Sequence, residues 1–479
     1  MRLPRSAALP PSARPAWRRY LPLTLLVLAA YLLYLPLTSY PRLVYDAELY
    51  WFISIYFHKV GSLSLLHFHD AMRGYVWPLL LLPARVAQFY SGLPPLAFTR
   101  LLGALSAAGG FGLLGPLLWQ AVVDPAPLSG PRRLAFAALG FGFWRDHFNF
   151  PLTDFPALWA LGLGLLLLFR RPGQLGAALG AGICLAAATN MRPIYLAAVP
   201  LFLALQWVLL PTGLGTGRRV GAVAALLLGG ALVLGPQLLI NQRHFGQATP
   251  LVLAQDANIA PGTLYRFKLL RGLKFQKYET SIGADYPQSV LFFFDPAGRR
   301  FVEQQRIREF GSTAEYARLV WQNPGFFAGL YLRRLFNGLD VQYPTPYIQR
   351  VYTPTWSLAA LNYSVWFAAA LVLWHRRHGV RRAQLLALAV LLLPCLLVLP
   401  TDVECRYLLP LHLLLYALVC FGWPAAWRPG LLPWRQLGLI GTGYALFLVL
   451  CFAASTATQA QLEYGGRSLR GQRLAPARP

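Results

Sequence analysis

Long apolar blocks recur along almost the whole chain, and many are near the length needed to cross a lipid bilayer. A membrane-spanning helix needs roughly 20 mostly apolar residues. Only 13% of the 479 residues are charged, whereas soluble domains average about 25%. So little charge would not solvate two or three soluble domains. We therefore expect an all-α polytopic membrane protein.

The apolar blocks predict about 11 transmembrane helices, with N-terminal residues 1–20 as a basic segment before the first. The first block lacks a small-x-small cleavage site, so we interpret it as an anchor that stays in the protein. The predicted spans are roughly 21–37, 100–122, 134–147, 154–169, 174–189, 194–210, 220–240, 356–374, 383–400, 407–423 and 436–456.

Residues 76–92 resemble a span but contain Pro78, Pro83 and Arg85. If this stretch crossed together with all the others, the later arginine clusters would lie outside. We interpret 76–92 as a juxtamembrane or re-entrant piece. The alternative is that 76–92 crosses and 134–147 does not. In both cases Asp46, Asp70 and Asp154 lie on the outer face.

The arginines are placed very unevenly between the two sides. In short loops basic residues favour the cytoplasmic side of a membrane. With the N-terminus inside, the inner segments carry 17 basic residues against one acid, Asp124. We therefore expect the N-terminus inside a plasma (inner) membrane. The inner basic residues are Arg2, Arg5, Arg14, Arg18, Arg19, Arg132, Arg133, Arg170, Arg171, Arg218, Arg219, Arg376, Arg377, Arg381, Arg382, Arg428 and Arg435.

This topology divides the chain into five parts with two large extracytoplasmic segments. The basic tail carries Arg467, Arg470, Arg473 and Arg478, which count modestly against the orientation because they lie outside. The parts are 1–20 (inner basic end), 21–240 (catalytic membrane module, including outer segment 38–99), 241–355 (large outer segment), 356–456 (C-terminal helices) and 457–479 (tail).

Ionisable residues gather in the predicted outer loops, where polar groups at membrane depth are costly and commonly functional. Asp46 is a candidate general base, or an interfacial acid. Asp154 is the second candidate catalytic acid, as a ligand of a metal or of the acceptor; the alternative is a helix N-terminal acid. The candidate substrate-binding residues are Glu48, Asp70, Arg73, Asp146, His147, Arg192, Glu404 and Arg406.

Arg192 and Arg406 stand at outer helix ends, where a guanidinium group matches phosphate geometry. Glu404 lies two positions before Arg406 and could orient it. The alternative for both arginines is snorkelling to lipid headgroups. Basic residues of the large outer segment predict attraction to anionic membrane lipids, with a solvated face as the alternative; they are Arg266, Lys268, Arg271, Lys274 and Lys277.

The net charge of +26 would suggest nucleic acid in a soluble chain, but here the basic residues lie between apolar blocks, so we expect no nucleic-acid partner. The sequence has no Walker A motif, G-x-S-x-G elbow or H-E-x-x-H motif. An enzyme of this kind would receive its activated substrate through the membrane.

Three segments, in order, resemble the GT-C membrane glycosyltransferases: YDAELYW after the first helix, PLTDFPALWALGLGLLLL, and ECRYLLPLHLLLYAL near the end. These enzymes use polyprenyl-phosphate sugars and include protein O-mannosyltransferases and the lipid A aminoarabinose transferase. The chain departs from the family in two ways. Asp-Ala-Glu stands where many members have adjacent Asp-Glu, and no WWDYG-like motif of the oligosaccharide-transferring branch occurs.

By this resemblance, Asp46 matches the catalytic acid of the first loop, and Arg406 resembles a late basic residue near the donor phosphate. Asp154 resembles an acid that helps to bind metal or acceptor. The candidate cofactor is a divalent cation, Mg²⁺ or Mn²⁺, with Asp154 as its candidate ligand.

The resemblance implies transfer of a sugar from a polyprenyl-phosphate donor to a lipid, glycan or protein acceptor, with inversion, at the extracytoplasmic face. The rival hypotheses are a transporter or flippase of an anionic lipid-linked substrate, and a polymerase or ligase of lipid-linked glycans. A transporter would favour midplane charges and internal repeats, whereas here the charges lie at outer helix ends.

Overall fold

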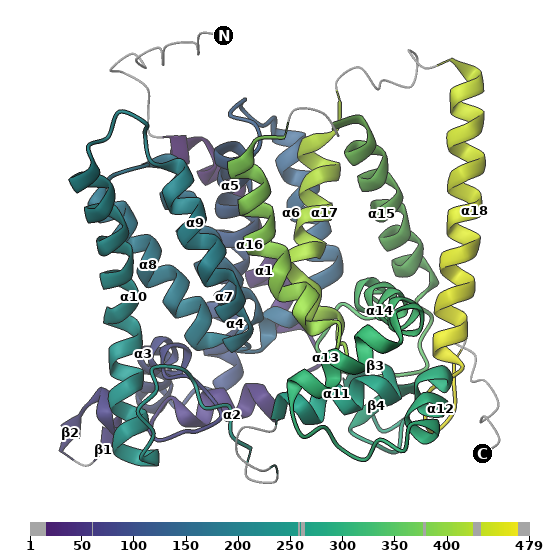
Figure 1. The fold of residues 1–479 in the computed structure, drawn as a ribbon, viewed down its shortest axis with the longest axis horizontal. Helices are drawn as coiled ribbons and strands as arrows, with labels where there is room; N and C mark the ends of the chain where they lie inside the picture. Colours follow the sequence, from purple (N-terminus) through teal and green to yellow (C-terminus); the bar gives the residue numbers. More distant parts are fainter. Residues whose placement is uncertain are drawn as a thin grey trace.

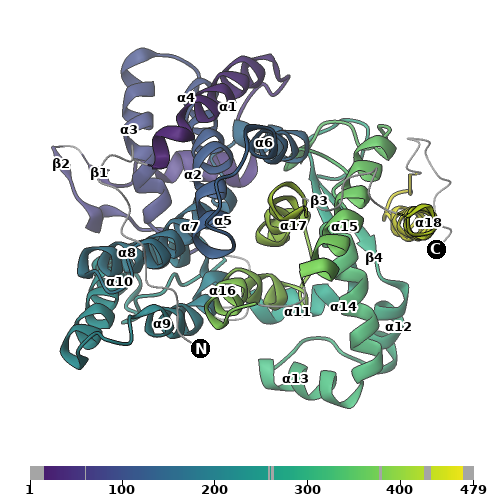
Figure 2. The same cartoon turned by 90° about the horizontal axis from the view of Figure 1, so that it is seen from above.

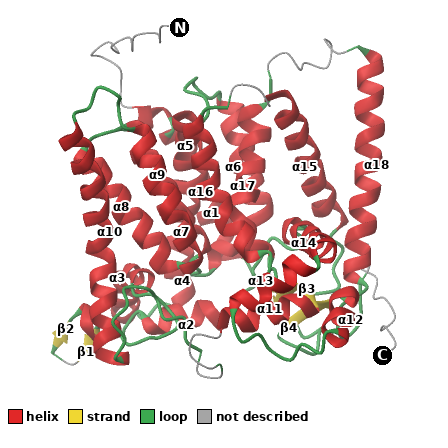
Figure 3. Ribbon diagram, viewed as in Figure 1, coloured by secondary structure: helices red, strands yellow, loops and turns green. Residues whose placement is uncertain are grey.

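The computed structural model describes residues 16–59, 61–256, 259, 264–376, 380–424 and 433–467. Most of this chain is helical, and the few short strands lie at one end of the molecule (Figure 3). Some of the basic residues that set the predicted orientation lie outside the described residues: Arg2, Arg5, Arg14, Arg377, Arg428, Arg470, Arg473 and Arg478.

A bundle of helices forms the body of the molecule (Figure 1). Their ends fall within a few residues of the predicted spans, except that α4 begins five residues early, α9 begins five residues late and α10 extends at both ends. The bundle helices are α1 (Leu21–Tyr34), α4 (Pro95–Ala107) with η4 (Ala108–Leu114) and α5 (Gly115–Val122), α6 (Gly130–Trp144), α7 (Asp154–Arg170), α8 (Leu175–Met191), α9 (Val199–Leu209), α10 (Thr216–Phe245), α15 (Trp356–Arg376), α16 (Arg382–Val398), α17 (Leu409–Gly422) and α18 (Trp434–Gln459).

Within the described residues, five helical segments are long and apolar enough to cross a membrane: Pro95–Val122, Thr216–Phe245, Trp356–His375, Cys405–Gly422 and Trp434–Gln459. These helices support the prediction of a helical membrane protein. Crossing by the other bundle helices stays a prediction.

Helix α3 (Val76–Ser91) corresponds to the ambiguous stretch 76–92. Figure 1 looks nearly along its axis, whereas Figure 2 shows it from the side, so α3 lies across the direction of the bundle. Helix α6, which covers most of the stretch 134–147, runs with the bundle. This arrangement favours the juxtamembrane interpretation of 76–92.

The two large segments between bundle helices fold at the same end of the molecule (Figure 1). The first contains α2 (Tyr45–Ile53), β1 (His58–Lys59) and β2 (Ser62–Leu63). The second contains α11 (Leu264–Lys274), β3 (Phe275–Ser281), β4 (Val290–Phe294), α12 (Pro296–Gln304), α13 (Thr313–Gln322), α14 (Pro324–Leu339) and β5 (Tyr347–Ile348). Short 3₁₀ helices are η1 (Ala16–Arg19), η2 (Leu35–Leu37), η3 (Leu65–His67), η5 (Arg145–Asn149), η6 (Pro193–Ala198) and η7 (Cys405–Leu408).

The second segment, which we call the sheet segment, adds to this helical fold a three-stranded sheet of order β4-β3-β5 that the sequence did not predict. Strands β3 and β4 are antiparallel, with a register shift between Phe275 and Lys277, and β5 adds to β3 in parallel. Burial alternates along β4, as expected for a strand with one face on a core.

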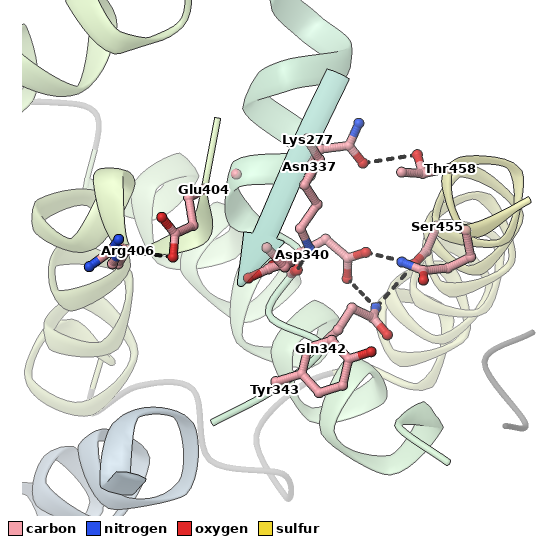
Figure 4. Close-up of polar contacts among 12 residues, drawn as sticks. Lys277, Asn337, Asp340, Gln342, Tyr343, Glu404, Arg406, Ser455 and Thr458 are labelled. Atoms are coloured by element: carbon pink, nitrogen blue, oxygen red, sulfur yellow. Dashed lines mark hydrogen bonds and ion pairs between the residues drawn. The ribbon is translucent and has the colours of Figure 1, made fainter. Parts of the chain in front are cut away.

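Arg467, in the segment predicted as the basic tail, is fully buried. Its guanidinium group donates to Gln342 at 3.1 Å and to Gln459 at 2.8 Å. Gln342 also binds Asp340 and Ser455, in the buried network of Figure 4 that attaches the C-terminal end of α18 to the sheet segment. The buried charge of Arg467 is tolerated because its N–H groups donate to acceptors of this network.

Candidate functional site

The loop before α3 and the C-terminal end of α8, which are distant in sequence, meet through Gly74 and Asn190. The Asn190 side-chain oxygen accepts a hydrogen bond from the Val76 backbone N–H at 2.9 Å. A Cβ atom at position 74 would lie 2.2 Å from the Asn190 carbonyl oxygen, so the close approach requires glycine. The contact joins the loop of Arg73 to the loop of Arg192.

Arg406 lies at the centre of a group of carboxylates. Its Nε lies 2.8 Å from Glu404 Oε1, a pair that Figure 4 shows facing each other. Its Nη1 lies 3.6 Å from Asp154 Oδ2, and its Nη2 lies 3.9 Å from Asp46 Oδ2. One guanidinium group therefore contacts acids from three separate loops.

Two more arginines complete this group. Arg73 Nη2 donates to Asp46 Oδ1 at 2.6 Å, and Arg192 Nη1 binds Asp154 Oδ1. We call the six side chains the ion cluster: Asp46, Arg73, Asp154, Arg192, Glu404 and Arg406. The structure thus brings together side chains from all four predicted outer loops, including both predicted catalytic acids.

The three acids of the ion cluster differ in exposure. The side chain of Asp46 is 38% exposed, whereas those of Asp154 and Glu404 are 3% and 1% exposed. A buried carboxylate held by arginines suits a positioning role. Asp46 is the acid of the ion cluster that an acceptor hydroxyl can approach most readily.

Asp46 and Glu404 lie outside the predicted spans, and their surroundings shift their pKa values in opposite directions. Burial acts to raise the pKa of Asp46, but Arg73, Arg406, Lys268 and Arg192 together lower it below its ordinary value. Burial raises the pKa of Glu404, and Arg406 only partly offsets this effect. Asp46 is therefore a carboxylate at neutral pH.

Asp46 lies in the first turn of α2, directly after a strained residue. Tyr45 has a φ of 48°, in the left-handed region that is unfavourable for a side chain of this size. Its hydroxyl donates to the Ser281 carbonyl at 3.2 Å, and its ring packs near that of Tyr347. The sheet segment thus holds the backbone that carries Asp46.

The sheet segment contributes side chains near the ion cluster, and the sequence did not predict this contribution. Lys268 Nζ lies 5.9 Å from the centre of the Tyr407 ring, and the Tyr278 hydroxyl hydrogen-bonds the Tyr407 hydroxyl. The Tyr278 backbone N–H donates to Val403 at 3.0 Å. No sequence motif marks Lys268 or Tyr278, and the sequence of β3 does not alternate between apolar and polar residues.

Two of the basic residues predicted to attract anionic lipids form ion pairs within the protein. Arg271 Nη2 lies 2.6 Å from Asp402 Oδ2, while its side chain stays 26% exposed, and this pair helps to attach the sheet segment. Lys277 is 1% exposed and pairs with Glu279 of the same strand at 3.0 Å. Burying Lys277 is favourable because its charge is paired, so this side chain does not face lipid.

Four predicted site residues lie outside the ion cluster. Glu48 is exposed and forms no ion pair with the described residues, as expected for an acid that only favours the start of α2. Asp70 closes a turn, because its Oδ1 accepts from the backbone N–H groups of Met72 and Arg73 at 2.9 and 2.7 Å. These contacts give Asp70 a role in placing Arg73.

Asp146 and His147 are also engaged elsewhere. Asp146 Oδ1 accepts from the Tyr34 hydroxyl at 2.7 Å. His147 is buried beside the Pro344 carbonyl.

The ion cluster does not fit a divalent cation. Asp154 presents one oxygen to Arg192 and the other to Arg406, and Asp46 presents its oxygens to Arg73 and Arg406. A metal ion at Asp154 would face guanidinium groups instead of further carboxylates. Among the described residues there is also no group of three or more His, Cys, Asp or Glu side chains that could hold a metal.

A large apolar cavity of about 810 Å³ lies within the bundle between α5, α7, α15, α16 and α17. Leu158 lines it one helical turn after Asp154, and Pro410 and Leu411 line it shortly after Arg406. The lining residues that come nearest to the ion cluster in sequence therefore follow Asp154 along α7 and Arg406 along α17, and the cavity lining itself is mostly apolar.

No protein-family model matches the chain, and a search of curated proteins found no match. Inference about function therefore rests on the chemistry of the site.

Proposed function

We propose that the chain is an integral-membrane glycosyltransferase that moves a sugar from a polyprenyl-phosphate donor to a lipid, glycan or protein acceptor. The observation that carries the proposal is the ion cluster, in which Arg406 joins Asp46, Asp154 and Glu404. The cluster lies where three segments resembling GT-C enzymes meet. It combines an accessible carboxylate with guanidinium groups suited to a phosphate.

In the proposed topology the chain crosses the membrane 11 times with its N-terminus inside. The ion cluster, α2 and the sheet segment then lie on the extracytoplasmic side of the plasma (inner) membrane. The arginine-rich connections lie on the other side, as the positive-inside rule requires. α3 lies along the outer interface.

In the proposed reaction, an acceptor hydroxyl oxygen attacks the anomeric carbon of the donor. The bond between that carbon and the phosphate oxygen breaks, and polyprenyl monophosphate leaves with the bonding electrons. Asp46 receives the proton of the acceptor hydroxyl. Attack opposite the leaving group inverts the anomeric centre.

Arg406 and Arg192 are the groups proposed to bind the donor phosphate. A guanidinium group stabilises the charge that grows on the leaving oxygen. Asp154 and Glu404 act as positioning residues, since each is buried and holds an arginine in place. On donor binding, the phosphate would take over part of the interaction that these arginines now have with carboxylates.

The apolar cavity supports a donor with a lipid chain. An isoprenoid tail is removed from water when it lies among leucine side chains, and the cavity is lined by Leu158, which follows Asp154 by four residues, and by Pro410, which follows Arg406 by four residues. A free nucleotide sugar has no lipid chain and would leave this apolar cavity unfilled.

Proteoliposomes supplied with labelled polyprenyl-phosphate sugars test the proposal and its rivals. Transfer to an acceptor with release of polyprenyl monophosphate supports a glycosyltransferase, and a chelator in the assay should not abolish it. Movement of intact donor across the bilayer would indicate a flippase. Consumption of diphosphate-linked oligosaccharides alone would indicate a polymerase or ligase.

The sugar and the acceptor can be identified by mass spectrometry of surface lipids and glycans, with and without the gene. Loss of one glycosylated species, and accumulation of its unmodified acceptor, is the expected result. An unchanged set of species would contradict the proposal.

A further inference from the structure

Helix α11 of the sheet segment is fixed against the end of α16 and the loop that follows it. The Tyr265 hydroxyl donates to the Leu397 carbonyl at 3.1 Å. A Cβ atom at Gly272 would lie 2.4 Å from the Pro400 carbonyl oxygen, so this close approach requires glycine. Lys268 lies between these two contacts on α11. Its position therefore follows from the docking of the helix and not from contacts of its own side chain.

Three cations from three parts of the chain gather around the ring of Tyr407. The guanidinium carbon of Arg192 lies 5.3 Å from the ring centre, and that of Arg406 lies 5.8 Å from it. Lys268 Nζ lies 5.9 Å from the same ring centre. Cations that converge in this way repel one another. The arrangement is therefore unfavourable unless anions balance it.

Carboxylates balance the two arginines but not Lys268. Arg192 and Arg406 both pair with Asp154. The Lys268 side chain is partly buried and has no ion pair or hydrogen bond with the described residues, although it lies close enough to Asp46 to help lower the pKa of that acid. The ion cluster holds three arginines and three acids, so Lys268 adds one positive charge that no carboxylate balances.

We propose that Lys268 joins Arg192 and Arg406 in binding the donor phosphate, and that its single unbalanced charge selects a donor with one phosphate group over a diphosphate. This inference rests on the proposed function and adds a binding residue and a donor class to it. An ammonium group binds phosphate as a point charge, so the flexible side chain of Lys268 needs no fixed partner before the donor arrives.

The charge balance carries the choice between the two donor classes. A sugar joined to a polyprenol through one phosphate is a phosphodiester with one negative charge. Its binding brings the ion cluster and Lys268 together to neutrality. A diphosphate-linked donor brings at least two negative charges and leaves one of them without a cation, which is costly where water is partly excluded. Specificity here is the difference between these two binding free energies.

Native mass spectrometry of the purified full chain tests the proposal with probes that carry no sugar. The probes are the methyl ester of a polyprenyl phosphate, which has one negative charge, polyprenyl diphosphate, uncharged polyprenol and phosphatidylglycerol. Lys268→Met keeps the length of the side chain and removes its charge, whereas Lys268→Arg keeps the charge. The matched control is Lys274→Met on the same helix, because the Lys274 side chain is also partly buried and has no ion pair with the described residues.

The parent, Lys268→Arg and Lys274→Met should all bind the methyl ester more tightly than the diphosphate, the polyprenol or phosphatidylglycerol. Lys268→Met should bind the methyl ester about tenfold more weakly, as expected when a charge-assisted hydrogen bond is lost. Its binding of polyprenol should be unchanged, which shows that the variant is folded and that the effect belongs to the charge.

Equal binding of the methyl ester by the parent and Lys268→Met would overturn the role of Lys268. Binding of the diphosphate as tight as that of the methyl ester in the parent would overturn selection by charge. Equally tight binding of phosphatidylglycerol, with the same dependence on Lys268, would assign this charge to bulk lipid and overturn the proposal. Sugar transfer in proteoliposomes tests the proposed function separately, so a parent that transfers sugar while Lys268→Met binds the methyl ester normally would remove Lys268 alone.

Discussion

Asp46 keeps its charge because cations surround it, and Arg73 is the nearest of them. A general base works only when deprotonated, so turnover falls as pH falls through its pKa. Because that pKa lies below the ordinary value of about 3.9, the parent should keep full base function down to mildly acidic pH.

Replacing Arg73 with glutamine should move the acidic limb of the pH profile upward. The substitution removes the cation that lowers the pKa of Asp46 most, while the effect of burial remains. Turnover measured against pH is the readout, with Arg42→Gln as control. An acidic limb at the same pH in the parent and in Arg73→Gln would contradict the role assigned to this pair.

Arg406→Lys should reduce turnover and weaken donor binding, although the charge is kept. Lysine offers one ammonium group and cannot contact Glu404, Asp154 and a phosphate with a planar fork. We expect a loss of roughly tenfold or more, since removal of one well-placed donor can cost about 10²–10³ in rate. Arg300→Lys, at an exposed position, is the control; equal activity of the two variants would exclude Arg406 from the site.

At the scale of elements, the apolar blocks predicted most helix ends well, because bilayer thickness limits the length of an apolar helix. The length of apolar blocks predicts little about the two large segments, 38–99 and 241–355. β3 and β4 were missed because their short sequences do not alternate between apolar and polar residues. The orientation of α3 also depended on counting crossings, since its composition alone is ambiguous.

The pair α8 and α10 packs closely through small residues. A Cβ atom at Gly182 would lie 1.9 Å from the Leu226 carbonyl oxygen, whereas one at Gly176 on the same helix meets nothing within 4 Å. Close backbone approach at small residues is a common way for membrane helices to associate. The helix that precedes Arg192 is therefore held by a tight contact.

Gly182→Val should destabilise the protein by about 1–3 kcal/mol, since it overpacks this contact. Gly176→Val is the matched control and should be close to the parent. The measurement is thermal unfolding in one detergent at equal protein concentration. If both variants unfold at the same temperature, α8 and α10 are not packed as described.

At the scale of the whole molecule, the sequence indicated which loops carry the site, because charges near helix ends on one side must face the same compartment. It therefore predicted Asp46, Asp154 and Arg406 as neighbours. It did not indicate Lys268 or Tyr278, whose positions depend on the fold of the sheet segment. The burial of Arg467 was missed for the same reason.

Accessibility to a membrane-impermeant maleimide tests the topology. Glu303→Cys, on the sheet segment, should be labelled in intact cells, and Ser129→Cys, between α5 and α6, only after permeabilisation. The five native cysteines are buried or partly buried, so background labelling should be low. The reverse pattern would invert the proposed orientation.

The most direct test of the central claim is the turnover of purified Asp46→Asn with its polyprenyl-phosphate donor and acceptor. Asparagine keeps the size of the side chain but cannot accept the proton, so turnover should fall by about 10²–10⁴. Glu48→Gln, two positions away and outside the ion cluster, should remain close to the parent. Turnover of Asp46→Asn within a few-fold of the parent, at normal protein level, would contradict the account.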